Sequence, residues 1–162
     1  MPYLEPRLAT GDDVAILVRH RARMFAEMGV PQDERFAAMC TASSPWFRDA
    51  IARGTYAGFL IASADAPQQI VAGAGLLFLE WPPGLYDVAT ARADILTVYT
   101  EIEHRNRGLA RTLTLAAIDE ARRRGVRVVT LHASDAGRRL YERLGFVQTN
   151  EMRLIVSPSR DV

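Results

Sequence analysis

Lysine is absent from this chain of 162 residues, and all 20 of its basic residues are arginines. The 19 acidic residues nearly balance them, so the formal net charge is only +1. A general affinity for nucleic acid needs a strong positive excess or a basic stripe, and neither is present. The composition therefore excludes a nucleic-acid partner of the non-specific kind.

Cysteine and histidine are also scarce. Cys40 is the only cysteine, which excludes an intrachain disulfide and any zinc site built from several cysteines. Its neighbours suggest no base that would activate it, so we expect a buried or neutral thiol. The three histidines, His20, His104 and His132, show no metal-ligand spacing, and no metal is expected.

Long apolar runs are missing as well. No stretch approaches the roughly 18 to 20 residues that a membrane span requires. The N-terminal segment MPYLEPRLATGDD is too polar and too rich in proline for a signal peptide. We expect a cytoplasmic protein without a membrane partner, folded as a single domain over residues 1–162.

Helical patterns come first along the chain. Thr10, with Asp13 three residues later, resembles a capping box, and apolar residues at helical spacing follow from Val14 to Met28. Two further helices are predicted, over residues 33–40 and 45–53. Glycine ends the last of them, as it commonly does at helix C-termini.

Strand patterns follow. Residues 56–62 and 70–79 are predicted to form a hairpin around a turn at 64–69, and residues 95–100 are predicted to form the next strand. A strong helix over 108–124 precedes a strand over 126–132 and a helix over 136–144. Two last strands are expected, one from Phe146 onward and one over 152–156. This order indicates a mixed α/β or α+β domain.

The most informative stretch is LTVYTEIEHRNRGLARTL, residues 96–113, in which a strand, a turn rich in arginine and a helix follow one another. The start of a helix exposes backbone N–H groups and the positive end of the helix dipole. Gly108 has no Cβ and would let a ligand approach the backbone closely. With the charges of Arg105, Arg107 and Arg111, this turn suits a phosphate or pyrophosphate. The alternative is a tight turn with solvated arginines.

The turn also resembles a known family motif. Arg105-Asn106-Arg107-Gly108-Leu109-Ala110 is similar to the R/Q-x-x-G-x-G/A signature with which GNAT acetyltransferases hold the coenzyme A pyrophosphate. The preceding segment, residues 98–104, resembles the family's lead-in, with Ile102 where proline is common. Downstream, Leu140-Tyr141-Glu142-Arg143-Leu144-Gly145-Phe146 resembles the family's L-Y-E-k-L-G-F segment.

This resemblance implies the GNAT fold, a mixed central sheet of about six to seven strands flanked by helices, with a splayed pair of central strands. It also implies that acetyl-CoA is a co-substrate and assigns roles to particular residues. The backbone at Val98, Tyr99 and Thr100 would bind the pantetheine arm and polarise the thioester carbonyl. The amides from Asn106 to Arg111 would hold the pyrophosphate, and Tyr141 would protonate the departing thiolate. Ser134 stands where many relatives have asparagine; serine is the shorter side chain but keeps a donor and an acceptor, so its contact with the coenzyme arm would be made directly or through water.

Two parts of the chemistry stay open at this stage. Glu80, Glu101 and Asp94 are each candidates for the group that accepts the proton of the amine, since an alkylamine has a pKa of about 10. His132 could face the cleft or serve a structural role. The acceptor is expected against the N-terminal helices and the loop after Glu80, where aromatic and acidic residues would suit a cationic amine. These residues are Glu27, Met28, Trp46, Phe47, Glu80, Trp81 and Tyr86.

The sequence therefore favours an N-acetyltransferase that acts on a primary amine of a small molecule, by direct attack in a ternary complex. The alternatives are a non-catalytic domain that binds or senses acyl-CoA, acetylation of a protein or peptide amine, and a partner-binding module on a related scaffold. The absence of lysine fits either a coding bias or a surface that cannot acetylate itself. A homodimer is an expectation from the family alone.

Overall fold

A five-stranded sheet with the order β1-β2-β3-β4-β5 forms the centre of the first of two compact units. The computed structural model describes residues 2–155, and the two units meet in sequence between His132 and Ala133. Neighbouring strands are antiparallel except β4 and β5, which are parallel. The strands are β1 Arg7–Leu8, β2 Tyr56–Ala62, β3 Ile70–Glu80, β4 Ala91–Thr100 and β5 Val129–Leu131.

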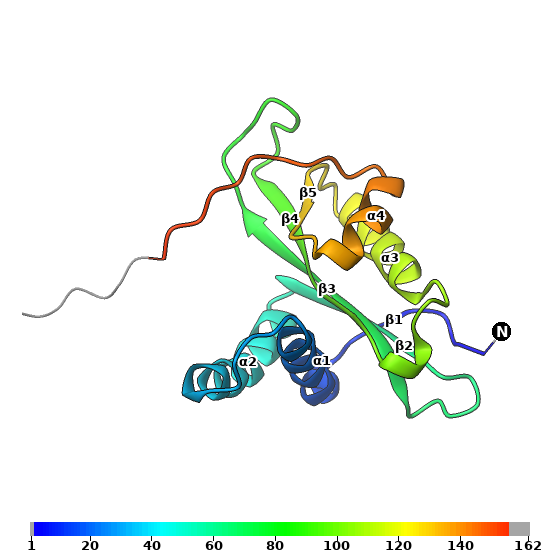
Figure 1. Cartoon of the computed structure of the whole chain (residues 1–162). Helices are drawn as coiled ribbons and strands as arrows, with labels where there is room; N and C mark the ends of the chain where they lie inside the picture. The colour runs from blue at the N-terminus through cyan, green and yellow to red at the C-terminus, as the bar shows by residue number, and fades with distance from the viewer. Residues whose placement is uncertain (1, 156–162) are drawn as a thin grey trace, which may run out of the picture. The chain divides into compact units, whose positions relative to one another are not determined.

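Helices cover both faces of this sheet (Figure 1). The helices α1 Val14–Glu27 and α2 Glu34–Ala52 lie on one face, and α3 Leu109–Arg123 lies on the other. Every residue of β2 is buried, as expected for a strand covered on both sides. The expected class, a mixed sheet flanked by helices, is confirmed, but the expected number of six to seven strands is wrong for the described residues.

The register shows which side chains of β3 and β4 point to each helix layer, because residues paired across two strands share a face. Gly73, Gly75 and Leu77 pair with Tyr99, Leu96 and Asp94. A Cβ on Gly73 would meet the His20 ring of α1, so this set faces α1 and α2. The intervening residues face α3, where the Arg124 guanidinium lies 4.1 Å from the centre of the Phe78 ring.

The entry to α1 follows the predicted pattern. The Thr10 hydroxyl accepts a hydrogen bond from the Asp12 amide, and the Asp13 carboxylate accepts one from the Thr10 amide at 2.9 Å. This capping box precedes a short 3-10 turn, η1 Gly11–Asp13, and then α1. The predicted helix start is confirmed.

The two helices predicted over 33–40 and 45–53 are one helix, α2, and Pro45 lies inside it. Proline removes one backbone donor and often ends a helix. Here Phe47 and Ala50 remain on the buried face beyond the proline, and their burial holds the helix together. The prediction of a break at residues 41–44 is therefore wrong.

β5 is shorter than the predicted strand over 126–132. The Val126 amide donates to the Ala121 carbonyl at the end of α3, and the Arg127 amide donates to the Asp87 carboxylate at 3.2 Å. These backbone groups are thereby committed to a helix end and a loop, so only Val129–Leu131 remains for the sheet. Conversely, β4 starts at Ala91, four residues before the predicted start.

The second unit contains α4 Asp135–Arg143, which matches the helix predicted over 136–144. The strands predicted from Phe146 onward and over 152–156 are not formed within 146–155, and Val156 lies outside the described residues. Val147, Met152, Leu154 and Ile155 are exposed there. Alternating side chains predict a strand, but a strand also needs a partner for its backbone, which periodicity does not identify.

Among the described helices, none is long and apolar enough to cross a membrane.

Candidate functional site

β4 carries a bulge at the centre of the candidate site. Leu96 pairs with Gly75 and Tyr99 pairs with Gly73, so three steps along β4 oppose two along β3. Thr97, within the bulge, has a φ of 50°, a left-handed conformation that threonine rarely adopts. Bulges and positive-φ residues of this kind concentrate next to functional sites.

Beyond the bulge, one edge of β4 has no strand partner among the described residues. Pairing with β5 covers Ala93, Asp94 and Ile95, and β4 continues to Thr100. The Glu101 amide donates to the Val71 carbonyl of β3 at 2.8 Å. Because successive amides of a strand point to opposite edges, the Thr100 amide points to the open edge. The segment predicted to bind the pantetheine arm, Val98 to Thr100, thus lies where β4 extends past β5.

The turn before α3 also has an unusual backbone. Asn106 and Gly108 have φ values of 59° and 82°, and Gly108 caps α3 without a side-chain hydrogen bond. A Cβ on Gly108 would meet no heavy atom within 4 Å, so the space beside it is open. The first amide to donate back within the helix is that of Thr112, to the Gly108 carbonyl. The amides of Leu109, Ala110 and Arg111 are therefore the donors that helix geometry leaves without an intrahelical partner, beside the open space at Gly108. Donors in this arrangement suit a diphosphate.

The three arginines of this turn have different surroundings. Arg105 donates to the Glu27 carboxylate at 2.6 Å and to the Thr100 carbonyl at 3.0 Å. Arg107 donates to the Tyr3 hydroxyl at 2.9 Å, and that hydroxyl also lies 3.1 Å from Nδ1 of His104. Arg111 is exposed. Two of the three predicted charges thus hold the turn to other parts of the chain.

Glu27 links α1 to this turn. Its second carboxylate oxygen accepts a hydrogen bond from the Tyr99 hydroxyl at 2.8 Å. Burial works against ionisation, but the hydrogen bonds from Arg105 and Tyr99 prevail and lower the pKa of Glu27. Burial and the Glu27 carboxylate together raise the pKa of Tyr99. Glu27, expected from the sequence near the acceptor, is therefore fixed in an ionised hydrogen-bonded arrangement.

The three carboxylates considered as proton acceptors lie in different places. Glu80 is exposed at the end of β3, with no ion pair among those found in residues 2–155. Glu101 is bound by Arg23 and, at 3.4 Å, by Arg19, and it lies 3.5 Å from Nε2 of His20. Asp94 is nearly buried and accepts a hydrogen bond from the Thr130 hydroxyl at 2.7 Å. Asp94 lies on the sheet face of α1 and α2, just before the bulge.

The predicted lining of the acceptor site is not gathered into one cluster. Phe47 is fully buried and packs with Trp46 and Tyr56, so it belongs to the core. Trp81 lies beneath the Arg92 guanidinium at 3.8 Å. Met28 and Tyr86 are exposed.

The second unit holds the remaining predicted residues. Ser134 caps α4 by accepting a hydrogen bond from the Gly137 amide at 3.3 Å. The Tyr141 ring lies edge-on to Phe146 at 6.0 Å, and burial raises the pKa of Tyr141. Its phenol is therefore protonated at neutral pH, which a proton donor requires. His132 is exposed at the end of the first unit.

Sequence reasoning did not identify two residues of α1 near the site. His20 is fully buried against Tyr99, with a ring separation of 5.2 Å. The Nη1 atom of Arg21 lies 3.4 Å from the Thr97 hydroxyl at the bulge. Both occupy positions in an ordinary amphipathic helix, and nothing in their spacing marks them as functional. Within residues 2–155, no group of three or more histidine, cysteine, aspartate or glutamate residues is arranged to hold a metal.

The family model described as the acetyltransferase (GNAT) family matches residues 11–146. No curated protein matches the sequence. A GCN5-related N-acetyltransferase from Ralstonia eutropha JMP134 is 33% identical, with 94% of this chain and 97% of that chain covered and a TM-score of 0.86.

A second solved structure, a predicted acetyltransferase with acetyl-CoA from Clostridium acetobutylicum, is 25% identical over 94% of this chain and 95% of that chain, with a TM-score of 0.83. A third, a putative acetyltransferase from Agrobacterium tumefaciens, is 26% identical over 95% and 100%, with a TM-score of 0.66. The family model matches most of the sequence, and the first of these relatives is 33% identical. Both findings are consistent with the turn capped by Gly108 and the open edge of β4. The chain belongs to the GNAT family of acetyl-CoA-dependent acetyltransferases.

Proposed function

We propose that this enzyme transfers the acetyl group of acetyl-CoA to a primary amine of a small molecule, within a ternary complex. The observation that carries the proposal is the combination of a free edge on β4 with the open N-terminus of α3. The free edge of β4 offers backbone hydrogen-bond donors to the extended pantetheine arm, and the N-terminus of α3 offers them to the diphosphate. The Clostridium acetobutylicum relative was solved with acetyl-CoA, which supports the same assignment.

A thioester is an activated acyl donor, so an amine can attack its carbonyl carbon without a covalent enzyme intermediate. The new carbon–nitrogen bond replaces the carbon–sulfur bond, the nitrogen loses a proton and the coenzyme leaves as a thiol. The residues of this chain have four tasks in that exchange. Val98, Tyr99 and Thr100 bind and orient the arm, and the amides from Asn106 to Arg111, with Gly108 between them, bind the diphosphate.

The other two tasks concern protons. Tyr141 donates one to the departing sulfur, and its raised pKa keeps the phenol protonated at neutral pH. A carboxylate on the acceptor side takes one from the amine, with Asp94, Glu80 and Glu101 as candidates. Asp94 has the geometry that suits this task, since it lies on the face of α1 and α2 just before the bulge. Ser134 contributes one hydroxyl toward the arm.

Calorimetric titration with acetyl-CoA and with pantetheine, which lacks the diphosphate, tests the binding half of the proposal. Tight binding of acetyl-CoA and weak binding of pantetheine are expected. A thiol-release assay with a panel of amines then tests turnover. Binding without turnover on any amine or peptide would identify an acyl-CoA-binding domain, and absence of binding would overturn the proposal. Turnover restricted to peptide N-termini would move the acceptor from small molecules to proteins.

A further inference from the structure

Arg21 is a half-buried arginine of α1 that points at the bulge of β4. Its Nη1 atom donates to the Thr97 hydroxyl at 3.4 Å, and its guanidinium carbon lies 4.9 Å from the centre of the Phe25 ring. A guanidinium carries five N–H donors in a planar fork. The contact with Thr97 uses one of them, and it is long.

Arg21 differs from its neighbours on α1 in its partners. Arg19 and Arg23 both bind the Glu101 carboxylate. For Arg21, no aspartate or glutamate within residues 2–155 forms an ion pair. Burial lowers the pKa of Arg21. Burying a cation without a counter-ion is costly, and an arriving anion would offset that cost.

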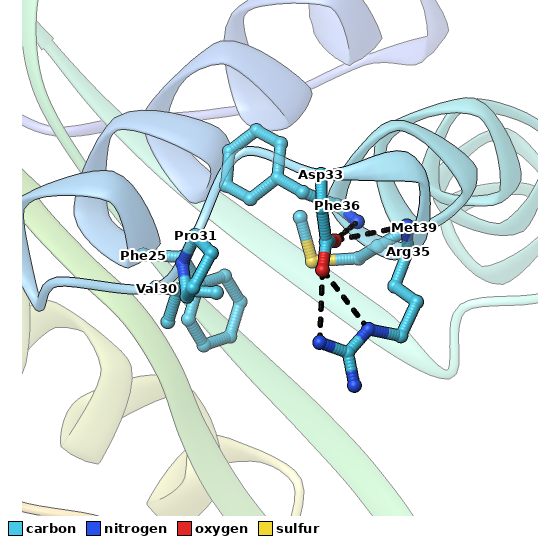
Figure 2. A pocket seen from close by; sticks show the side chains of 7 residues that line it. All are labelled: Phe25, Val30, Pro31, Asp33, Arg35, Phe36 and Met39. Carbon is cyan, nitrogen blue, oxygen red and sulfur yellow. Dashed lines mark hydrogen bonds and ion pairs between the residues drawn. The ribbon is translucent and has the colours of Figure 1, made fainter.

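An apolar hollow of about 360 Å³ is lined in part by Phe25 (Figure 2), the residue whose ring also contacts the Arg21 guanidinium. Its only acidic residue, Asp33, is already engaged, because its carboxylate accepts hydrogen bonds from the Arg35 side chain and from the amides of Arg35 and Phe36. The hollow therefore offers an apolar surface rather than a site for a cation. It is lined by Phe25, Val30, Pro31, Asp33, Arg35, Phe36 and Met39.

We propose that Arg21 binds a carboxylate of the acceptor, so that the acceptor is an amine carrying both a carboxylate and an apolar side chain. This inference rests on the proposed transferase function. Thr97 precedes Val98, which is assigned to the thioester, so a carboxylate held at Arg21 places a nearby amine beside the reacting carbonyl. Planar guanidinium groups bind carboxylates through two parallel hydrogen bonds, which fix orientation as well as affinity. The aromatic and acidic residues in the sequence suggested a cationic amine, and Arg21 adds a carboxylate to that expectation.

The activity test uses matched amines that differ only in the carboxylate: leucine with isopentylamine, and phenylalanine with phenethylamine. In the wild-type chain, kcat/KM should favour the acid of each pair by about tenfold to a hundredfold. Arg21→Met keeps the apolar stem but removes the charge, and it should lower kcat/KM for the acids by the same factor. The amines without a carboxylate should change by less than about threefold. Arg53→Met is the control, since Arg53 forms only an exposed pair with Asp49 at the end of α2.

A second measurement needs no turnover. Cys40 is the only cysteine; it is half-buried on α2 and directly follows Met39, which lines the hollow. The measured quantity is the rate at which the anion iodoacetate alkylates Cys40, divided by the rate for neutral iodoacetamide. A high ratio indicates that Arg21 attracts carboxylates to the surroundings of Cys40. The ratio of the two rates should fall several-fold in Arg21→Met and stay unchanged in Arg53→Met. Affinity for acetyl-CoA should be the same in all three proteins.

The outcomes separate the two proposals. If the wild-type chain turns over the amines without a carboxylate as fast as the amino acids, the role of Arg21 is overturned and the transferase function is left intact. An equal loss for both members of each pair in Arg21→Met also overturns it, because that loss reflects packing. An unchanged alkylation ratio overturns it whatever the enzyme does. Acetyl-CoA binding without turnover on any amine contradicts the proposed function, while a reduced alkylation ratio in Arg21→Met would still show a carboxylate site.

Discussion

The Tyr56 side chain lies directly over Gly75 of the neighbouring strand. A Cβ built on Gly75 would come within 2.1 Å of the Tyr56 hydroxyl and 2.6 Å of two ring carbons. Gly75 in turn pairs with Leu96, the last residue of β4 before the bulge. The glycine thus makes room for an aromatic core residue at the edge of the candidate site.

Gly75→Ala should destabilise the fold by about 1–3 kcal/mol, because the added methyl group overlaps a ring that is itself held in the core. Unfolding in urea measures the change. Gly11→Ala is the matched control, since a Cβ there meets nothing within 4 Å, and it should shift stability by no more than about 0.5 kcal/mol. Equal stability of the two variants would mean that Tyr56 can move aside.

His20 should make stability depend on pH. Its ring nitrogens make no hydrogen bond, although the Glu101 carboxylate lies 3.5 Å from Nε2, and burial together with the charges of Arg19 and Arg23 lowers its pKa to about 4. The unfolded chain, with a histidine pKa of about 6.5, binds the proton first as the pH falls. Stability is therefore complete above about pH 6.5 and declines toward pH 4, by about 2 kcal/mol at pH 5.

His20→Leu should abolish that part of the pH dependence. The comparison is the difference in unfolding free energy between pH 7.5 and pH 5, for the wild type and for the variant. Carboxylates titrate in both proteins, so subtracting one difference from the other isolates His20. An identical decline in both would mean that this imidazole is hydrated or paired when protonated.

Gly108→Glu should weaken acetyl-CoA binding by more than about a hundredfold, because it adds bulk and negative charge where the diphosphate is expected. Gly125→Glu provides a close control at the other end of α3. Both glycines have a positive φ, 82° and 74°, and both face open space. The two variants therefore bear the same backbone strain, and only the first should lose affinity in calorimetry. Equal affinities would place the diphosphate elsewhere.

Tyr141→Phe should lower kcat by about tenfold or more, with little effect on the affinity for acetyl-CoA. The pKa of Tyr141 lies above its ordinary value near 10, so activity of the wild-type enzyme should not decline from this group until the pH exceeds that range. Rates for the wild type and the variant across pH 7 to 10 test this. Unchanged turnover in Tyr141→Phe would assign the proton to water or to another group.

The sequence predicted the features whose signals are local. The capping box at Thr10 and Asp13, the β2–β3 hairpin and the glycine ends of α3 all depend on residues a few positions apart. It failed where the outcome depends on distant partners. Whether Pro45 interrupts α2 depends on the core contacts of Phe47, and whether residues 146–155 form strands depends on a neighbouring edge.

The residues of the candidate site also differ in how far the sequence could predict them. The turn at Gly108 and the β4 segment were predicted because they form a contiguous motif. Arg21 and His20 were not, since they reach the site from α1 across more than 70 residues of sequence. Arginine 105 was predicted as a phosphate ligand, while the structure also shows its contact with Glu27, a partner 78 positions away.

The additional residue in β4 has a consequence for how this strand can vary. It reverses the alternation of side chains: Asp94 and Leu96 face α1 and α2, and after the bulge the odd-numbered Tyr99 takes that face. Removing one residue between Leu96 and Tyr99 would turn Tyr99 toward α3 and away from Glu27 and His20. Many side chains can replace Thr97, with asparagine and glycine best suited to its φ, but the number of residues cannot change. Relatives that keep the same arrangement should therefore differ freely in composition at this point and agree in length.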